Sequence, residues 1–585
     1  MAKYFFVVIF VTLLAVKPST SIINHKFFRG IDGGLECATC TVLLGLLDQL
    51  AEVNNQTIVE AADALCLKLP TEFQKPCQTV SDILVPIVVE MLAESANPDD
   101  ICRGLALCYT KKGTPPCALY KKTLKFDAKR IAYYQKRTRK HLLHRWNVKL
   151  KDEGSWSICE LPVINLLCVA YSDVFDKQVP FYDDDKDLHS TEQTLRGVSW
   201  KGKDCDDTDK DVYPGRKPKL LHDVSYDSNC NGIWGFDNQT GKSYEEQFCD
   251  GTGQIGVVVI GDSVGAHFHA PQEWFDPQLL TKASLHDLPF ALENELDWPQ
   301  LSLVTGYMNS TWSVAPGQTD SLYYRLFKRN RCNHRNYQNL AINGRESKDI
   351  VNVTRELRID KNTDYPLLLI VELVGNDVCN NKPSDETLKY MTTDKEMHDN
   401  LVQLFEELNK IVPSGSKVLI VGMADGDFLF KFLENRYHPF GRLRQDLKYP
   451  DIYDWWNCMR VTPCMGWLNS NATLRNLTTQ RANALSQVMS DLSRTHQHHW
   501  SNLELNYVKC PITTVITKYL VEHGPDSGYQ LIEPVDGFHP NQVGQALSAA
   551  EVWRHMELNL SHYLGDINKN NDAIKKVFKD QGGYN

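Results

Sequence analysis

The chain has 585 residues and a formal net charge of −10 at pH 7, with 42% hydrophobic and 23% charged residues. These values are ordinary for globular proteins and exclude collagen-like, coiled-coil and wholly disordered chains. The length predicts about two to four domains, and the negative charge argues against a nucleic-acid partner. The 17 cysteines indicate an oxidising compartment, because disulfides are rare in the cytosol.

The N-terminus has the layout of a cleaved secretory signal peptide. Lys3 precedes an apolar run at 4–16 that Lys17 and Pro18 follow, and this run is too short to span a bilayer comfortably. We expect a signal peptide over residues 1–22, with an uncleaved anchor as the alternative, and no transmembrane segment. The expected location is therefore secreted, lysosomal or in another intracellular vesicle. Sequons compatible with secretion begin at Asn55, Asn238, Asn309, Asn352, Asn471, Asn476 and Asn559.

A first unit combines cysteines with amphipathic stretches. Apolar residues recur at helical spacing over 41–53, 58–65 and 80–94, which predicts helices, and Pro86 is expected to kink the last one. The cysteines form a close pair, two central residues and another close pair, a spacing that resembles saposin-B type domains. The resemblance implies an all-α domain over residues 33–118 with the pairs Cys37–Cys108, Cys40–Cys102 and Cys66–Cys77.

Two questions about this unit stay open at the level of sequence. Cys37 and Cys40 form a CxxC, which could be a zinc half-site or a redox motif. Both readings fit poorly, because no second CxxC or His pair follows and no strand precedes Cys37. The apolar residues could form a lipid-binding face, as the saposin resemblance implies, or only the core of a small domain.

A basic segment follows the first unit. Residues 121–151 carry twelve Lys or Arg residues and one acid, Asp127. Such a run could attract anionic lipids, offer sites to a processing protease, or be only a solvated linker. We expect a linker and processing region over residues 119–156, which is also the clearest domain boundary.

Alternating acidic residues dominate the region from 173 to 231. Carboxylates this close repel one another, so they are best tolerated around a hard cation, and Ca²⁺ takes six to eight oxygen ligands. The loop lacks the central Gly and terminal Glu of an EF-hand; it resembles the DCDDxDxxVYPG calcium loops of some secreted proteins. We expect a structural calcium region over residues 157–250 with a Cys205–Cys230 disulfide, and a merely solvated acidic surface is the alternative. The candidate ligands are Asp183, Asp185, Asp187, His189, Asp204, Asp206, Asp207, Asp209, Asp211, Tyr213, Asp223, Asp227, Asn229 and Asn231.

The remainder, residues 251–585, alternates apolar runs with helical patterns. The runs at 255–260, 366–374 and 417–422 are uniformly apolar or nearly so, as expected for parallel strands covered on both faces. Helical patterns lie at 396–411, 472–493 and 541–558. We therefore predict an α/β/α domain with a parallel sheet, whose site lies beyond the carboxyl ends of the strands.

Four short blocks in this domain carry the chemistry. Gly261-Asp262-Ser263 ends the first strand, Asn343-Gly344 follows a strand-like stretch at 337–342, and Gly375-Asn376-Asp377 follows the run at 366–374. Asp536-Gly537-Phe538-His539-Pro540-Asn541 lies near the C-terminus. In this order the blocks resemble those of GDSL-type (SGNH) hydrolases, with Val264 where the family name has Leu.

The GDSL resemblance implies a role for each matching residue. Ser263 is the nucleophile, His539 the base and Asp536 the residue that orients His539. The backbone N–H groups of Ser263 and Gly344 and the side chain of Asn376 form the oxyanion hole. His267 and His269 lie close enough in sequence to contact substrate, but rim or core histidines are commoner and we do not count them as catalytic.

The whole combination, together with residues 294–301 and 533–541, resembles the acyloxyacyl hydrolase family. The resemblance implies a lipase that removes secondary fatty acyl chains from the lipid A of bacterial lipopolysaccharide. It also implies cleavage of a precursor before about Cys159 into two disulfide-joined subunits, for which we expect Cys117–Cys458. The residues alone indicate a serine carboxylester hydrolase acting on lipid. The alternatives are a broader GDSL phospholipase or lysophospholipase acting on phospholipids, or a lipid-binding protein with a vestigial site.

Overall fold

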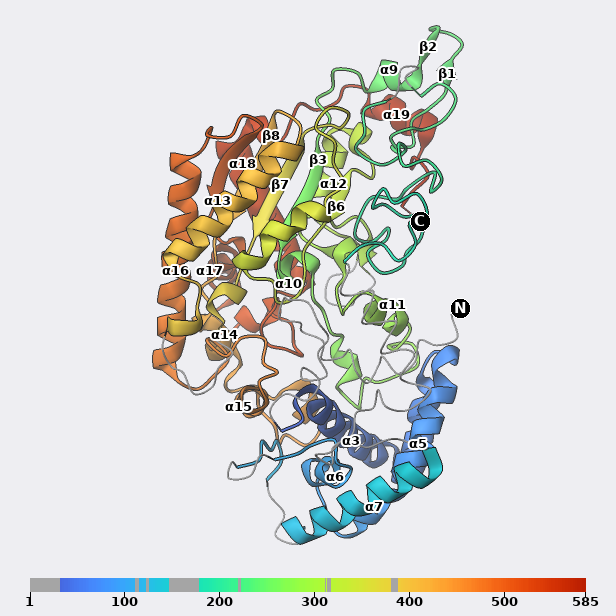
Figure 1. Ribbon diagram of the computed structural model, residues 1–585, viewed down its shortest axis with the longest axis vertical. Coiled ribbons are helices and arrows are strands. Elements are labelled where there is room, and N and C mark those ends of the chain that lie inside the picture. The colour runs from blue at the N-terminus through green and yellow to red at the C-terminus, as the bar shows by residue number, and fades with distance from the viewer. Residues whose placement is uncertain are drawn as a thin grey trace.

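The structure is a computed structural model that describes residues 32–110, 115–121, 126–146, 178–218, 223–310, 312, 317–379 and 388–584. The predicted signal peptide and the cleavage site expected before Cys159 lie outside these residues. Figure 1 shows a helical unit below a sheet-containing domain, with a loop-rich segment along one side of the sheet.

The helical unit has the disulfide pattern that the sequence predicted. Its helices are α3 (Gly34–Asn54), α4 (Ile58–Lys68), α5 (Thr71–Ala93) and α6 (Pro98–Gly104). Thr57 and Glu60 form a capping box that starts α4, and α5 continues through Pro76 and Pro86. The three bonds are Cys37–Cys108, Cys40–Cys102 and Cys66–Cys77, so the predicted pairing is confirmed.

The prediction of a linker over residues 119–156 is wrong for residues 128–146. These form α7 (Ala128–Trp146), which packs beside α6 (Figure 1). Tyr134 and Leu142 are buried in the core of the helical unit, and the Thr138 hydroxyl donates to the Gly104 carbonyl at 3.1 Å. Apolar residues at helical spacing lie among the basic ones and form one face of a helix. The many basic residues made this apolar pattern hard to recognise in the sequence.

Two helices of the described chain, Gly34–Asn54 and Phe73–Ala93, are long and apolar enough to cross a membrane. Both belong to the disulfide-linked helical unit. In the most apolar window of the first, 72% of residues are buried inside the protein, against 28% in the second. The first is therefore a core helix, while the second is buried over a smaller share of its length.

The second domain contains a five-stranded parallel sheet. Its strands are β3 (Gly256–Gly261), β6 (Tyr337–Asn339), β7 (Leu367–Glu372), β8 (Ser416–Val421) and β9 (Leu503–Val508), in the order β6-β3-β7-β8-β9. The first strand in sequence, β3, therefore lies between β6 and β7. The strand order therefore reverses at β3. In α/β folds, ligand-binding and active sites lie at such a switch point, beyond the carboxyl ends of the strands.

Helices cover both faces of the sheet, as the uniformly apolar strands predicted. Val258 and Ile260 pack toward α13 (Asp394–Ile411) and α16 (Ala472–Thr495). Val257 and Val259 pack toward the opposite layer, because successive side chains of a strand point to opposite faces. That layer consists of α12 (Leu322–Arg329), α17 (Pro511–His523) and α18 (Gln542–Asn559).

Short elements complete the described chain. They are β1 (Phe236–Asp237), β2 (Lys242–Ser243), α9 (Tyr244–Phe248), α10 (Ser263–Ala266), α11 (Leu288–Glu293), β4 (Asn309–Ser310), β5 (Gly317–Gln318), α14 (Asp427–Leu433), α15 (Tyr449–Met459) and α19 (Asn571–Phe578).

The helical unit and the sheet domain share one hydrophobic core. Leu46 and Met91 of the helical unit belong to the same buried cluster as Trp274 and Phe440 of the sheet domain. The Gln49 side-chain amide donates to the Phe440 carbonyl at 3.0 Å. A disulfide also joins Cys117 to Cys458 at the end of α15, which confirms the predicted bridge.

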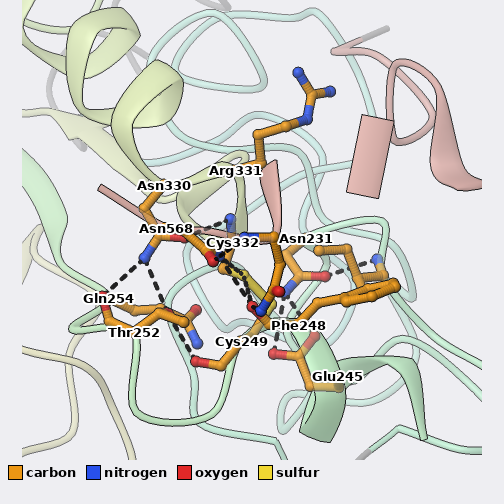
Figure 2. The surroundings of a disulfide bond; sticks show 12 residues. Asn231, Glu245, Phe248, Cys249, Thr252, Gln254, Asn330, Arg331, Cys332 and Asn568 are labelled. Atoms are coloured by element: carbon orange, nitrogen blue, oxygen red, sulfur yellow. Dashed lines mark hydrogen bonds between the residues drawn. A yellow bond between two sulfur atoms is a disulfide. The ribbon is translucent and has the colours of Figure 1, made fainter. Parts of the chain in front are cut away.

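The loop-rich segment, residues 178–250, is fixed internally and to the sheet domain by disulfides. Cys205 is bonded to Cys230, as predicted, and Cys249 is bonded to Cys332. Figure 2 shows the second bond, where Asn568 donates to the Phe248 carbonyl at 2.9 Å and to Asn330 at 3.0 Å. The C-terminal part of the chain therefore holds the end of this segment against the sheet domain.

Candidate active site

Ser263, His539 and Asp536 form a continuous hydrogen-bonded chain. His539 Nε2 lies 2.6 Å from Ser263 Oγ, and His539 Nδ1 lies 2.5 Å from Asp536 Oδ2. All three residues are buried, and the Phe268 ring centroid lies 4.8 Å from that of His539. Asp536 can only accept the Nδ1 proton, so Nε2 is left to accept the proton of the serine hydroxyl.

The turn that carries Asp536 and His539 is closed by its own backbone. Asp536 Oδ1 accepts hydrogen bonds from the N–H groups of Phe538 and His539 at 2.8 and 3.2 Å. Gly537 has φ +62°, and a Cβ there would lie 2.1 Å from the Tyr453 hydroxyl. Glycine is therefore required in the middle of this block.

Asp262 fixes Ser263 to the neighbouring strand end. Ser263 starts α10 directly after β3, and Asp262 Oδ1 accepts the N–H of Val264 at 3.0 Å. Its other oxygen accepts the N–H of Val374 at 2.8 Å. Asp262 had no separate predicted role, although its place in the first block is the signal that marks it.

The two other predicted oxyanion residues follow the strands on either side of β3. Gly344 follows β6 and has φ +76°, a conformation that favours glycine. Asn376 follows β7 at the start of a 3₁₀ turn, Asn376–Val378. The Cys379–Cys464 disulfide fixes the end of that turn. The sheet thus places Gly344, Ser263 and Asn376 at the ends of three adjacent parallel strands.

An apolar cavity opens beside Ser263. Ser263, Asn376, Val264, Leu303 and Ile512 are among the residues that line it. A second apolar cavity lies between the helical unit and the sheet domain, and Asp536 contributes to its wall together with Leu43 and Trp274. Leu43 also lines an apolar cavity inside the helical unit. Apolar cavities therefore lie inside the helical unit, between the two units and beside Ser263.

His267 and His269 are held by the protein and do not join the triad. His267 is fully buried and its Nδ1 donates to the Leu301 carbonyl at 3.1 Å. His269 Nδ1 lies 2.8 Å from both carboxyl oxygens of Glu533. Burial raises the pKa of Glu533 and lowers that of His269, so it favours the uncharged form of each group. Both residues line a cavity of about 870 Å³.

Five of the predicted calcium ligands converge. Asp183, Asp185 and Asp207 form one group whose carboxylate oxygens lie within 4.8 Å of one another, and Asp185, Asp187 and Asp204 form another. Within the described residues, one buried oxygen each of Asp185, Asp187 and Asp204 makes no hydrogen bond. Such an arrangement of oxygen donors fits a hard divalent cation.

The pKa values of these carboxyl groups are also consistent with a cation site. Burial and the neighbouring carboxylates raise the pKa of Asp187 to about 8. Burial, with the Asp185 and Asp207 carboxylates adding to it, raises the pKa of Asp204 to about 7. A bound cation would compensate these negative charges and favour the ionised carboxylates.

Three more acidic candidates hold turns or pair with a base instead. The Asp206 carboxylate accepts the N–H of Thr208 at 3.2 Å, and Asp209 accepts that of Asp211 at 3.1 Å. Asp211 itself pairs with Arg216 at 3.0 Å. These three lie outside the two convergent groups of the described chain.

The side chains of two other candidates are directed to protein groups. His189 Nδ1 donates to the Gly202 carbonyl at 2.7 Å, and burial lowers its pKa to about 3, so the ring is neutral. The Tyr213 hydroxyl donates to Asp364 at 2.8 Å.

The last four candidates form a separate hydrogen-bonded loop. Asp227 accepts the N–H of Gly232 at 2.7 Å, and Asp223 accepts that of Ser228 at 2.8 Å. The amides of Asn229 and Asn231 donate to Glu245, as Figure 2 shows for Asn231. Glu245 was not among the predicted ligands, because it lies outside the acidic run.

Comparisons with known proteins agree with this architecture. Residues 36–169 match the saposin-like domain family, and residues 257–552 match the GDSL-like lipase/acylhydrolase family. The acyloxyacyl hydrolase of Homo sapiens is 39% identical over 578 residues, which cover 98% of this chain and 97% of that protein. The acyloxyacyl hydrolase of Mus musculus is 39% identical over 553 residues and 94% of each chain. The chain belongs to the acyloxyacyl hydrolase family.

Membership of the acyloxyacyl hydrolase family confirms the predicted saposin-like and GDSL hydrolase domains and the ester hydrolase reaction class inferred from the motifs. The saposin-like match continues beyond residue 118 and includes α7. Saposin-C of Cavia porcellus is 31% identical over 75 residues, or 12% of this chain. The loop-rich segment lies between the two ranges of residues that match these families.

Proposed function

We propose that this protein is a secreted or lysosomal serine lipase that hydrolyses the acyloxyacyl-linked, secondary fatty acyl chains of lipid A and thereby detoxifies lipopolysaccharide. The observation that carries the proposal is the Ser263–His539–Asp536 chain beside an apolar cavity. The relatives are named acyloxyacyl hydrolases, which supports an acyloxyacyl ester as the bond that is cleaved. A lipid-binding protein with a vestigial site would not need the intact catalytic geometry.

The proposed reaction begins with transfer of the acyl group to the enzyme. His539 Nε2 takes the proton of Ser263 Oγ as this oxygen attacks the ester carbonyl carbon, and Asp536 stabilises the imidazolium. The ester C–O bond then breaks, and the leaving 3-hydroxyacyl oxygen takes the proton from His539. Water, deprotonated by His539, hydrolyses the acyl-serine and releases the fatty acid.

The negative charge of each tetrahedral intermediate falls on the former carbonyl oxygen. The N–H groups of Ser263 and Gly344 and the Asn376 amide are the donors proposed to stabilise it. Pre-oriented donors of this kind are worth about 10²–10³-fold in rate each. Removal of Asn376 should therefore cost less than removal of Ser263.

The apolar cavities support a long-chain lipid substrate. The cavity shared by the helical unit and the sheet domain would shield acyl chains that have left a lipid aggregate, since transfer of apolar surface from water is favourable. Lipopolysaccharide is the proposed substrate. Phospholipid remains the substrate of the alternative, a broader GDSL phospholipase.

We also propose that the Asp183, Asp185, Asp187, Asp204 and Asp207 carboxylates hold structural Ca²⁺. The cation would compensate the charge of these carboxylates and so fix the loop-rich segment. None of the five lines the cavity beside Ser263, which supports a structural role.

Cleavage into two subunits is the last part of the proposal. A cut between the helical unit and the loop-rich segment would leave a small and a large subunit. The Cys117–Cys458 bond would then connect them.

The test compares wild type with Ser263→Ala, His539→Ala and Asn376→Ala on lipopolysaccharide, phospholipid vesicles and a small soluble ester. We expect Ser263→Ala and His539→Ala to lose several orders of magnitude in turnover, and their double variant to be scarcely worse, because the two act as a unit. Asn376→Ala should lose about 10²–10³-fold. Release from phospholipid but not from lipid A would favour the alternative, and full activity of Ser263→Ala would contradict the catalytic assignment.

A further inference from the structure

A buried arginine from the loop-rich segment extends into the sheet domain. Arg196 is 3% exposed, and its guanidinium lies over the Trp200 ring at 3.6 Å from the centroid. One nitrogen, Nη1, donates to the Ala341 carbonyl at 3.0 Å. The other, Nη2, lies 3.7 Å from a carboxylate oxygen of Glu295. Arg196 therefore contacts two separate parts of the sheet domain, from a segment outside the GDSL match.

One contact of Arg196 is with the loop that ends at Gly344, and the other is with a residue that binds this loop. Ala341 lies in that loop, between β6 and Gly344. The Asn343 amide donates to the Glu295 carbonyl at 3.2 Å, so Glu295 contacts Arg196 through its side chain and Asn343 through its backbone. The loop that contains the proposed oxyanion N–H is thus bound at Ala341 by Arg196 and at Asn343 by Glu295.

The backbone around this contact is strained. Arg196, Glu295 and Leu296 have φ values of +57°, +60° and +64°, in the left-handed region that residues other than glycine seldom adopt. Such conformations cost free energy and persist only where the surroundings over-determine them. Here three of them adjoin one buried ion pair, beside the proposed oxyanion loop.

A purely structural core position would not require an arginine. An apolar side chain could fill the same volume, but it would leave the Ala341 carbonyl and the buried Glu295 carboxylate without this donor and cation. Replacing both partners of a buried ion pair by apolar groups often stabilises proteins, whereas removing one partner alone destabilises them. The buried ion pair of Arg196 and Glu295 is therefore better explained by a need to orient the loop than by a gain in stability.

We propose that Arg196 is a positioning residue for the oxyanion hole: by holding Ala341 and Glu295 it fixes Asn343 and aims the N–H of Gly344 at the developing oxyanion. This inference rests on the proposed esterase mechanism. It gives the loop-rich segment a part in catalysis, because the charged group that orients one edge of the site comes from that segment.

The test uses full-length Arg196→Met and Arg196→Lys, with Arg216→Met as the matched control. Arg216 belongs to the same segment and pairs with Asp211. Turnover of a small soluble ester is normalised to the number of reactive serines, titrated with an alkyl fluorophosphonate. We expect Arg196→Met to lower kcat about 10- to 100-fold, as small displacements of catalytic groups do, with KM little changed. Arg196→Lys should retain part of the rate, and Arg216→Met should resemble wild type.

Two inhibitors separate positioning from mere structural support. A trifluoromethyl ketone adds to Ser263 and places an oxyanion in the hole, whereas the corresponding ether analogue of the substrate does not. Arg196→Met should weaken the ketone by about the same factor as kcat, because both depend on the transition-state contact. Binding of the ether analogue should be unchanged.

The proposal is overturned if kcat per titrated serine is unchanged, or if both inhibitors weaken equally. Should Arg196→Met fail to fold, Arg196→Lys and Glu295→Gln carry the same test with the same two criteria. A soluble ester is used throughout, so a failure of the lipid A assignment would leave these results intact. Full activity of Ser263→Ala in the same assay would instead refute the esterase mechanism itself.

Discussion

Cys117 and Cys458 form a disulfide bond although 341 residues separate them in sequence. Cys117 follows the last saposin cysteine, and Cys458 lies near the end of α15 in the sheet domain. The bond therefore connects the two units that a cut in the intervening segment would separate. Their shared hydrophobic core and the Gln49–Phe440 hydrogen bond form a second, non-covalent connection.

The Cys117–Cys458 bond should be the covalent link in processed protein. After cleavage, Cys458→Ser should give two bands on a non-reducing denaturing gel, whereas wild type gives one. Both should elute as one species in native gel filtration, because the shared core persists. Two bands from cleaved wild type without reductant would contradict this prediction.

Leu43 should matter more for aggregated lipid than for a soluble ester. It lines both the cavity in the helical unit and the cavity that adjoins the sheet domain. Burial of a leucine-sized group is worth about 1.5–3 kcal/mol, so Leu43→Gln should lower turnover of lipopolysaccharide by about 10- to 100-fold. Turnover of a soluble ester should hardly change.

The matched control is Val59→Gln, since Val59 on α4 is 48% exposed and lines neither cavity. Equal losses of Leu43→Gln on both substrates would indicate structural support alone. This point substitution is sharper than deletion of residues 37–108, because the deletion would expose the shared core.

Removal of calcium should lower thermal stability without abolishing the chemistry. A ligand that binds only the folded state stabilises it by about 2.7 kcal/mol at 100 times its dissociation constant. Chelation should therefore lower Tm, and hydrolysis of a soluble ester should persist well below the new midpoint. Asp185→Asn should weaken binding, because Asp185 belongs to both carboxylate groups.

Asp237→Asn is the control for the calcium site, because Asp237 accepts the Gln239 N–H at 2.9 Å and belongs to neither group. An unchanged Tm and unchanged bound metal after chelation would refute the site. Loss of turnover in a folded, metal-free protein would make the ion catalytic.

Glu372 should make stability fall with rising pH. It is 1% exposed at the end of β7, and burial, with the Asp262 charge adding to it, raises its pKa from 4.5 to about 8. The folded state therefore holds this proton up to about pH 8, while the unfolded chain releases it near pH 4.5. Because the folded state binds more protons over this window, its stability decreases as pH rises.

Glu372→Gln removes that proton exchange. Its Tm relative to wild type should rise between about pH 4.5 and pH 8 and level off above pH 8. Thermal melts of both proteins across pH 4–9 check this expectation. Parallel curves would show that Glu372 does not titrate in this window.

The sequence was sufficient to predict the central strands and the proximity of Ser263, His539 and Asp536, for two physical reasons. Strands buried on both faces, such as β3 and β7, are continuous apolar runs, and Ser263 and His539 lie in short blocks whose order is informative. The edge strand β9 was not predicted because it mixes buried and half-buried side chains, with two half-buried residues in succession. It therefore lacks an apolar run.

Contacts between distant segments could not be predicted from local patterns. Arg196 reaches Ala341 across 145 residues, and nothing near Arg196 in sequence marks it as different from a surface arginine. Alternating aspartates predicted a cation loop. The structure is needed to distinguish Asp185 and Asp204, whose carboxylates converge, from Asp211, which pairs with Arg216.

The central claim is tested most directly by mass spectrometry of the fatty acids released from purified lipopolysaccharide by wild type and by Ser263→Ala. Wild type should release the chains esterified to 3-hydroxyacyl groups and leave the primary hydroxyacyl chains on the sugar, while Ser263→Ala should bind the lipid but release almost none. Release of primary chains, or equal release by Ser263→Ala, would contradict the account.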